Sequence, residues 1–173
     1  MPLHHTFLST PIGLMKAAAT DAGLCYLQFA EAKYADKLWD KVLGGLETPV
    51  LEAENDVLAA LRLQLDAYFA ERLKQFNLPL GASGTAFQQR VWQSLLQIPY
   101  GSTCSYLEQA RSLGDTKAIR AVATANGANP IAIVTPCHRV LGSKGELTGY
   151  AGGLQRKRFL LELEGFSSSP SLF

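Results

Sequence analysis

The sequence has few cysteines and no long hydrophobic run. Its three cysteines, Cys25, Cys104 and Cys137, are an odd number at wide spacing without a CxxC pair. Such a set fits neither a disulfide framework nor a cysteine zinc knuckle. No stretch approaches the roughly 18 consecutive apolar residues of a membrane span, and residues 1–5 lack the basic-then-apolar order of a secretory signal. These absences predict a cytoplasmic protein without membrane association, in which a free thiol is available for chemistry.

The composition is that of a folded protein with an uneven charge distribution. The 173 residues are 47% hydrophobic and 18% charged, which is enough apolar material for a sizeable core. Residues 1–85 contain 7 Lys and Arg against 10 Asp and Glu, whereas residues 86–173 contain 9 against 5. The net charge of +1 therefore combines −3 with +4, and the C-terminal half is the candidate anion-binding half. Ordinary solvated charges also produce such differences, so motifs must decide.

The N-terminal half predicts a small antiparallel sheet with one helix. Residues 7–10, 14–19 and 24–29 are typical of short strands, and the last two are joined by a tight Asp/Gly turn. Residues 51–69 have the 3.6-residue apolar period of an amphipathic helix, which should lie on the sheet. Residues 74–85 have no clear periodicity and are expected to link two lobes.

The C-terminal half predicts a mainly helical lobe. Thr85 can cap a helix that ends before Pro99. Residues 105–113 and 116–126 form two short helical segments around a tight glycine turn, and Asp115 is well placed to cap the second. This pattern is typical of a helix-turn-helix, whose second helix usually meets DNA, although an ordinary helical hairpin fits the pattern equally well.

The expected fold class is therefore α+β with two domains. We expect an α/β domain with its linker over residues 1–84 and a DNA-binding domain over residues 85–173. The Ser-rich tail 167–170 is expected to be frayed.

The second helix of the pair carries small side chains beside one arginine. Ala121 and Ala125 are spaced i, i+4 next to Arg120, and side chains that commonly read base edges in the major groove are largely missing. Small side chains allow close backbone approach, which suits docking by groove shape in the minor groove. Arg120 could then wedge into the base stack.

Cys137 differs from the other two cysteines in its surroundings. The apolar run 131–134 leads directly into Cys137, His138 and Arg139. A thiolate is the nucleophilic form of cysteine, and adjacent cations lower the pKa of a thiol. We therefore expect Cys137 to be a nucleophile with His138 as its base and a distant carboxylate orienting the imidazole. Cys25 and Cys104 are expected to be small buried hydrophobes.

Two other functions remain open on these residues alone. A cysteine hydrolase would also use a Cys–His pair, but hydrolases usually bring their histidine from elsewhere in the sequence. A helix-turn-helix module that binds DNA without reacting would need no thiol at Cys137.

The C-terminal half resembles a known family, the O6-alkylguanine-DNA alkyltransferases. The resemblance covers residues 85–165 nearly continuously, and its motifs are highly specific in combination; residues 1–84 match only loosely, through the outline of strands then helix and the turn at 10–13. The motifs are Ile-Val-Thr-Pro-Cys-His-Arg-Val at 133–140, Arg-Ala-Val at 120–122, Asn-Pro at 129–130, Pro-Tyr-Gly at 99–101, Ser-Tyr at 105–106, Gly-Tyr-Ala-Gly-Gly-Leu at 149–154 and Leu-Leu-Glu-Leu-Glu-Gly at 160–165. In that family the N-terminal domain has an RNase H-like fold.

The resemblance implies a chemical role for Cys137 and for three residues around it. Cys137 would attack the alkyl carbon on O6 of guanine, or on O4 of thymine as a second candidate, and would be consumed as an irreversible thioether in a single turnover. His138 would take the thiol proton through a water, and Glu164 would orient and compensate it. Asn129 would shape the turn between the recognition helix and the active site.

The resemblance also implies how a damaged base would reach the thiol. The base must be flipped out of the duplex, because a thiolate cannot reach O6 within a stacked pair. Arg120 would fill the gap while Ala121 and Ala125 dock in the minor groove, and Tyr106 would crowd the phosphate and donate to the leaving guanine. The expected pocket consists of Val140 and Tyr150 as lining, Ala151 as a backbone donor where many members have Ser, and Lys157 in a supporting role.

We expect the protein to bind neither a metal nor a cofactor. We also expect it to be a monomer. Some members of that family hold a structural zinc in the N-terminal domain. Here that half offers only Cys25 and the adjacent His4 and His5, which are awkward for a tetrahedral site.

Overall fold

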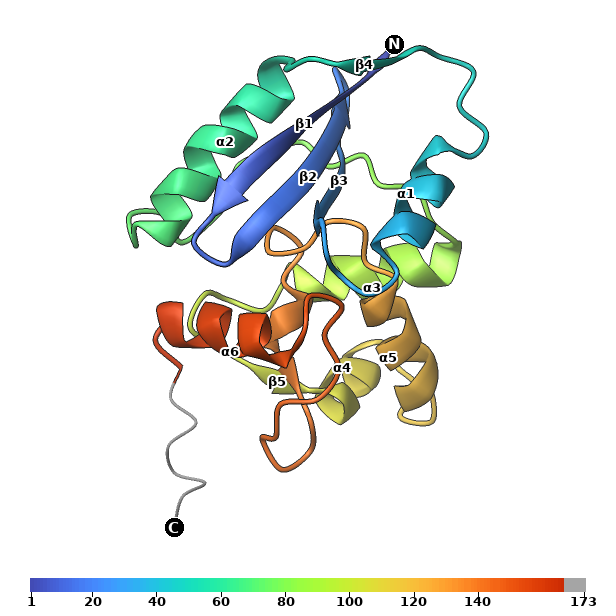
Figure 1. Ribbon diagram of the computed structural model, residues 1–173. Coiled ribbons are helices and arrows are strands. Elements are labelled where there is room, and N and C mark those ends of the chain that lie inside the picture. The colour runs from blue at the N-terminus through green and yellow to red at the C-terminus, as the bar shows by residue number, and fades with distance from the viewer. Residues whose placement is uncertain (167–173) are drawn as a thin grey trace. The chain divides into compact units, whose positions relative to one another are not determined.

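The computed structural model describes residues 1–166, which divide into two compact units (Figure 1). Unit 1 contains residues 1–83 and 130–134, and unit 2 contains residues 84–129 and those from 135 onward. The segment 130–134 thus belongs to unit 1, whereas the sequence assigned everything after residue 84 to one domain. The tail at 167–170, expected to be frayed, lies outside the described residues.

Unit 1 is built on a four-stranded sheet with the order β3-β2-β1-β4. Its strands are β1 (Leu3–Thr10), β2 (Gly13–Thr20), β3 (Gly23–Phe29) and β4 (Val50–Glu52). The expected antiparallel pairing is confirmed for β1, β2 and β3, whereas β4 runs parallel to β1 and makes the sheet mixed. β4 was missed because its three residues are all exposed and show no alternation of apolar and polar positions.

The helix expected over residues 51–69 is α2 (Asp56–Phe69), which starts five residues later because β4 occupies the chain before it. Asn55 caps α2, since its side chain accepts a hydrogen bond of 3.0 Å from the Leu58 backbone N–H. As expected, α2 lies along β1, β2 and β3 (Figure 1). It buries Leu58, Leu61 and Leu65 there.

A second helix, α1 (Ala35–Leu43), was not expected. Its N-cap residue, Tyr34, has a left-handed backbone (φ 67°) and makes no side-chain cap, so the sequence carries no start signal. Leu38 of α1 packs with Leu3, Ala18 and Tyr26.

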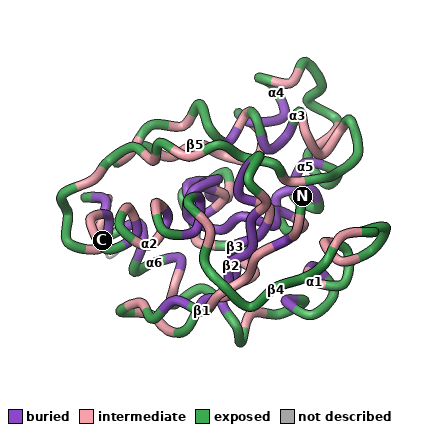
Figure 2. Tube along the Cα trace, turned by 90° about the horizontal axis from the view of Figure 1, so that it is seen from above, coloured by how far each residue is buried: buried purple, intermediate pink, exposed green. Residues whose placement is uncertain are grey.

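Both faces of the sheet are covered at its centre. Ala17, Ala18 and Ala19 in β2 are all fully buried, although successive strand residues point to opposite faces. Buried residues gather along β2 and β3 (Figure 2). The segment 130–134 runs along β3: the Leu27 N–H donates to the Pro130 carbonyl and the Ala132 N–H to the Leu27 carbonyl, each at 2.8 Å.

Unit 2 is mainly helical, as expected. Its helices are α3 (Ala86–Leu95), α4 (Tyr106–Ser112), α5 (Ile119–Gly127) and α6 (Leu154–Leu163), and it also contains the 3₁₀ turn η1 (Cys137–Arg139) and the parallel strand pair β5 (Cys104–Ser105) and β6 (Val140–Leu141). Thr85 caps α3 as predicted, in a capping box with Gln88. Ser105 and Glu108 form a second capping box at α4.

The second helix of the predicted pair begins later than expected. α5 starts at Ile119 rather than near residue 116, and Ala118 at its N-cap gives no side-chain cap. The Asp115 carboxylate accepts from the Lys117 N–H at 2.9 Å, so it stabilises the turn before α5 instead of capping the helix.

Candidate active site

Two tight turns lead the chain to Cys137. Around Ile133, which has φ 70°, the Val134 N–H donates to the Ala132 carbonyl at 2.8 Å. A positive φ is strained for a β-branched residue, and such strain gathers at functional sites. Around Pro136, the Cys137 N–H donates to the Thr135 carbonyl at 2.9 Å, and η1 begins at Cys137.

Asn129 connects the end of α5 to the cysteine. Its buried side-chain Nδ2 donates to the Thr135 carbonyl at 2.8 Å and to Cys137 Sγ at 3.3 Å. The structure thus places Asn129 at the turn where the resemblance put it, and the amide holds the sulfur directly as well as the backbone.

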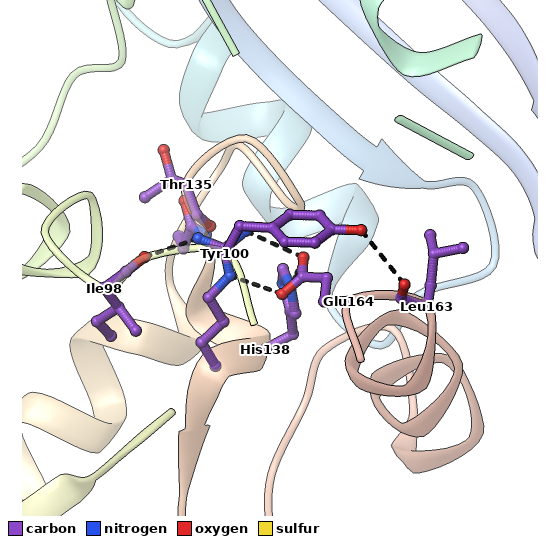
Figure 3. A network of polar contacts seen from close by, with 8 residues as sticks. Ile98, Tyr100, Thr135, His138, Leu163 and Glu164 are labelled. Carbon is purple, nitrogen blue, oxygen red and sulfur yellow. Dashed lines mark hydrogen bonds and ion pairs between the residues drawn. The ribbon is translucent and has the colours of Figure 1, made fainter. Parts of the chain in front are cut away.

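His138, the residue that follows Cys137 in the chain, forms a buried pair with Glu164 (Figure 3). The His138 Nε2 and Glu164 Oε2 atoms are 2.8 Å apart, although the residues are 26 positions apart in the chain. Glu164 is the C-cap of α6, a helix that the sequence analysis did not predict. An ionised Glu164 accepts a hydrogen bond from the N–H at Nε2, which leaves Nδ1 of a neutral imidazole as a proton acceptor. Nδ1 is buried and makes no hydrogen bond within residues 1–166.

Arg139 holds the other side of the same carboxylate. Its Nε donates to Glu164 Oε1 at 2.8 Å, its Nη2 to Oε2 at 3.0 Å, and its Nη1 to the Ile98 carbonyl at 2.7 Å. Tyr100, which stacks loosely on this guanidinium, donates from its hydroxyl to the Leu163 carbonyl at 3.3 Å (Figure 3). The sequence suggested Arg139 as a cation beside the thiol, but the residue is instead the anchor of Glu164.

These contacts determine the charges of the pair. Burial by itself would raise the pKa of Glu164, but the hydrogen bonds from His138 and Arg139 outweigh it and lower this pKa to about 2. Burial lowers the pKa of His138 and outweighs the opposing effect of Glu164. At neutral pH the site therefore holds an ionised Glu164 and a neutral His138, which is the basic form of the imidazole.

The expectation that neighbouring cations lower the pKa of Cys137 was wrong. Burial raises the pKa of this thiol, and the Asn129 hydrogen bond and the charge of Lys157 offset only part of the effect. The side chains next in sequence cannot help, because Arg139 is bound to Glu164 and His138 is neutral. Cys137 is partly exposed, and at neutral pH it is a thiol that needs a base.

Lys157 of α6 is fully buried and fixes the loop after β6. Its Nζ donates to the carbonyls of Val140 at 2.6 Å, Thr148 at 2.8 Å and Gly149 at 3.3 Å. Burial lowers the pKa of Lys157 to about 8, against the opposing effect of Cys137. The sequence contains no local signal for this role, because the three carbonyls come from main chain 8 to 17 residues away.

The remaining expected pocket residues lie on the same loop or beside it. The Tyr106 hydroxyl donates to the Thr148 carbonyl at 3.2 Å. Tyr150 and Ala151 are partly buried, and burial raises the pKa of Tyr150 well above its usual value. The Val140 side chain is fully buried, and the Val140 carbonyl accepts a hydrogen bond from Lys157.

The expected docking face on α5 needs one correction. Arg120 and Ala121 are exposed as predicted, but Ala125 is 97% buried, with only 3% of its surface exposed. The i, i+4 spacing places both alanines on one side of the helix, but Trp92 of α3 covers the later one and donates from Nε1 to the Ala125 carbonyl at 2.9 Å. The small residues that α5 does expose beside Arg120 are Ala121, Ala123 and Thr124.

The other two cysteines, Cys25 and Cys104, are partly buried. Burial raises the pKa of both thiols, that of Cys104 to about 11. Within the described residues no three His, Cys, Asp or Glu side chains lie together as a metal ion would need. Over the same range no helix combines the length and the apolar character of a membrane span.

Both parts of the chain match models of one family. Residues 3–82 match the ribonuclease-like domain of 6-O-methylguanine DNA methyltransferase, and residues 86–166 match its DNA binding domain. The first match agrees with the RNase H-like fold that the resemblance implied for the N-terminal domain.

Full-length relatives give the same result. The chain is 47% identical over 170 residues to a methylated-DNA–protein-cysteine methyltransferase of Mycobacterium leprae, which covers 98% of this chain and 97% of that one. It is 44% identical over 164 residues to the protein of that name from Methanosarcina acetivorans, covering 94% of this chain and 99% of the relative.

Solved structures of similar proteins share the fold. The crystal structure of Mycobacterium tuberculosis OGT in complex with DNA superposes with a TM-score of 0.80 at 44% identity, covering 93% of this chain and 92% of that one. The O6-methylguanine-DNA methyltransferase of Pyrococcus kodakaraensis gives a TM-score of 0.67 at 25% identity, covering 95% and 99%. The α+β class is thus confirmed, and the chain belongs to the 6-O-methylguanine DNA methyltransferase family.

Proposed function

We propose that this protein repairs alkylated duplex DNA by transferring the alkyl group from O6 of guanine to Cys137. Family membership supports the reaction class. The observation that carries the assignment to Cys137 is the buried pairing of Glu164 with His138, the residue that directly follows the partly exposed Cys137. Such a nucleophile, base and orienting carboxylate form the arrangement that nucleophilic catalysis needs.

The proton and electron movements balance without a cofactor. His138 takes the proton of the thiol at Nδ1 through a water, and Cys137 Sγ forms a bond to the alkyl carbon. The bond between that carbon and O6 breaks, its electron pair stays on the guanine, and a proton from Tyr106 or water completes the restored guanine. The proton held by His138 then replaces the one that Tyr106 or water gave up, so no net charge is left in the site. The products are a thioether on Cys137 and an undamaged base. Because a thioether is a poor leaving group, each molecule acts once.

The raised pKa of Cys137 explains why the base is necessary. Burial opposes the thiolate, so ionisation has to be coupled to proton transfer onto His138. The resulting imidazolium is compensated by Glu164, which Arg139 keeps ionised and fixed in place. The positive charge of Lys157 favours the thiolate in the same step.

The exposed face of α5 supports docking in the minor groove. Ala121, Ala123 and Thr124 allow the helix backbone to approach DNA closely, and Arg120 projects from the same exposed part. In our proposal Arg120 occupies the space of the flipped base while Tyr106 helps to turn the nucleotide out. Val140, Tyr150 and Ala151 would then line the pocket.

We further propose that the protein acts as a monomer in the cytoplasm on chromosomal DNA. The docking helix α5, the general base His138 and the thiol of Cys137 all belong to unit 2 of one chain, so the reaction needs no second copy of the protein. The same displacement on O4-alkylthymine has identical atom balance and is the second substrate to test.

Mass spectrometry after incubation with a duplex that contains one O6-methylguanine tests the proposal. We expect one methyl mass per protein molecule, located on the peptide that contains Cys137. Cys137→Ala should abolish the gain and keep DNA binding, while Cys104→Ala, the matched control, should be methylated as the wild type is. An unchanged protein mass, or methylation on another peptide, would overturn the proposal. Repeated turnover of an ester with an acyl adduct on Cys137 would favour a hydrolase instead.

A further inference from the structure

Two buried amides connect α4 to α5. Gln109 Nε2 donates to Asn126 Oδ1 at 3.0 Å, and Asn126 Nδ2 donates back to Gln109 Oε1 at 2.7 Å. Both residues are almost fully buried, with 2% and 6% of their surface exposed. Gln109 Nε2 also donates to Ser94 Oγ of α3 at 3.1 Å. We call this reciprocal Gln109–Asn126 pair the amide clasp.

The amide clasp restricts geometry more strongly than an apolar contact does. Two apolar side chains tolerate small slides and rotations, because burial depends on area and has no direction. Two reciprocal hydrogen bonds require the amides to be coplanar and at one separation. A buried amide without its partner is also costly, so the pair disfavours other helix arrangements.

The amide clasp lies in the C-terminal half of α5, where other contacts also hold the helix. The N-terminal end of α5 has no side-chain cap, and the buried side chains of the helix are Val122, Ala125 and Asn126. Trp92 holds the Ala125 carbonyl from α3. Arg120 therefore lies before the first buried side chain of the helix, whereas the hydrogen bonds from Trp92 and Gln109 hold the C-terminal half of α5.

A small change at Asn126 is magnified at Arg120. The two residues are six positions apart, which is about 9 Å along a helix axis. A tilt of roughly 10° about Asn126 would therefore move the Arg120 backbone by about 1.5 Å. Misplacement by about 1 Å can cost on the order of 100-fold in rate when a reaction depends on docking geometry.

We propose that the amide clasp is a positioning device that sets the tilt and rotation of α5, and thereby the position of Arg120 on duplex DNA. This inference rests on the proposed docking of α5. Gln109 and Asn126 are positioning residues that act through α5. A free O6-alkylguanine base needs the pocket but not the helix, so the clasp should affect transfer from duplex DNA and leave transfer from the free base unchanged.

The main test compares two substrates and two double variants. Gln109→Met with Asn126→Leu replaces both amides by apolar groups of similar size, so neither is left unpaired. Gln109→Asn with Asn126→Gln exchanges the amides and keeps the pairing. Single-turnover rates are measured with an O6-methylguanine duplex and with free O6-benzylguanine, together with the thermal unfolding midpoint.

We expect the apolar double variant to react with the free base within about twofold of the wild type and with the duplex at least tenfold more slowly. The exchange variant should recover most of the duplex rate. A purely structural clasp would lower both rates together or neither, and either result would overturn the inference. Arg120→Ala separates the two proposals: if it leaves the duplex rate unchanged, the docking of α5 is wrong.

A single variant decides the question if the apolar double variant does not fold. Gln109→Glu keeps an acceptor for Asn126 Nδ2 but loses the donor to Asn126 Oδ1 once the carboxyl ionises. The ratio of duplex rate to free-base rate should then fall with rising pH in this variant more steeply than in the wild type. An identical pH dependence of that ratio in both proteins would contradict the positioning role.

Discussion

The two units bury polar groups very differently. Of the nine polar or charged residues that are buried within residues 1–166, only Gln28 belongs to unit 1. The other eight belong to unit 2 and are Gln109, Asn126, Asn129, Thr135, His138, Arg139, Lys157 and Glu164. Unit 1 is stabilised mainly by apolar burial, which tolerates substitution when volume is kept. Unit 2 depends on directional contacts that fail when one partner is removed.

The difference agrees with the proposed location of the chemistry in unit 2. Burying a charged group costs free energy unless it is paired, so a chain has no stability reason to bury so many. In unit 2 each buried charge has its partners: Glu164 has His138 and Arg139, and Lys157 has three carbonyls. We therefore expect unit 1, whose sheet packs against α1 and α2, to act as a scaffold.

The largest effect on stability is expected from Arg139→Met. It leaves Glu164 ionised and buried without its bidentate partner, which should destabilise the protein by about 3–5 kcal/mol. Urea unfolding measures the loss. Adding Glu164→Gln should return part of the stability, since the unpaired charge is then removed. A loss below about 1 kcal/mol would show that the anchor contributes little.

Unit 1 should respond to Leu61→Ala in stability alone. Leu61 is fully buried in α2, and removing its side chain should cost about 2–5 kcal/mol through lost burial and a cavity. Below the melting range the rate of methyl transfer should equal that of the wild type, because no site residue is touched. Leu63→Ala, at a position that is 72% exposed on the same helix, is the control and should change neither quantity. A slower Leu61→Ala protein would contradict the scaffold role.

Acid should destabilise the protein through unit 2. The folded pKa of His138 lies below 6.5, so the unfolded chain takes up a proton first and stability falls as the pH drops below about 6.5. The folded pKa of Glu164 is also lowered, from 4.5 to about 2, so its contribution is present above pH 4.5 and is lost between these values. Glu164→Gln should flatten the lower part of this profile. Thermal melts from pH 7 to pH 3 test both statements, and a flat profile in the wild type would refute them.

The smallest effect on rate is expected from Lys157→Met, although this change should also lower the thermal unfolding midpoint, because the carbonyls of Val140, Thr148 and Gly149 lose their donor. The charge of Lys157 lowers the pKa of Cys137, so its removal should slow transfer from a free alkylguanine at pH 7 by on the order of tenfold. In the wild type this support should fade above about pH 8, where Lys157 itself loses its proton. The pH–rate profile of the variant should not show this change near pH 8. Lys144→Met, in an exposed loop position, serves as control.

Local signals accounted for a large part of the fold. The Asp-Ala-Gly turn at 21–23 predicted the β2–β3 hairpin, and Thr85 predicted the start of α3, because each signal depends on residues a few positions apart. α1 and β4 were missed because they lack such local signals. α1 begins without a side-chain cap, and β4 consists of three exposed residues that are a strand only through their pairing with β1.

By itself the sequence determined which chemical groups the protein has and where its short-range elements begin, including a thiol at Cys137 beside an imidazole. Tertiary structure alone decided the partners of these groups. Arg139 binds Glu164 instead of the thiol, Lys157 donates to three carbonyls, and Trp92 donates to the carbonyl of the buried Ala125. It also reversed the expected pKa shift of Cys137. The physical reason is that burial and long-range pairing determine the free energy of a charge, and neither can be derived from neighbours in the chain.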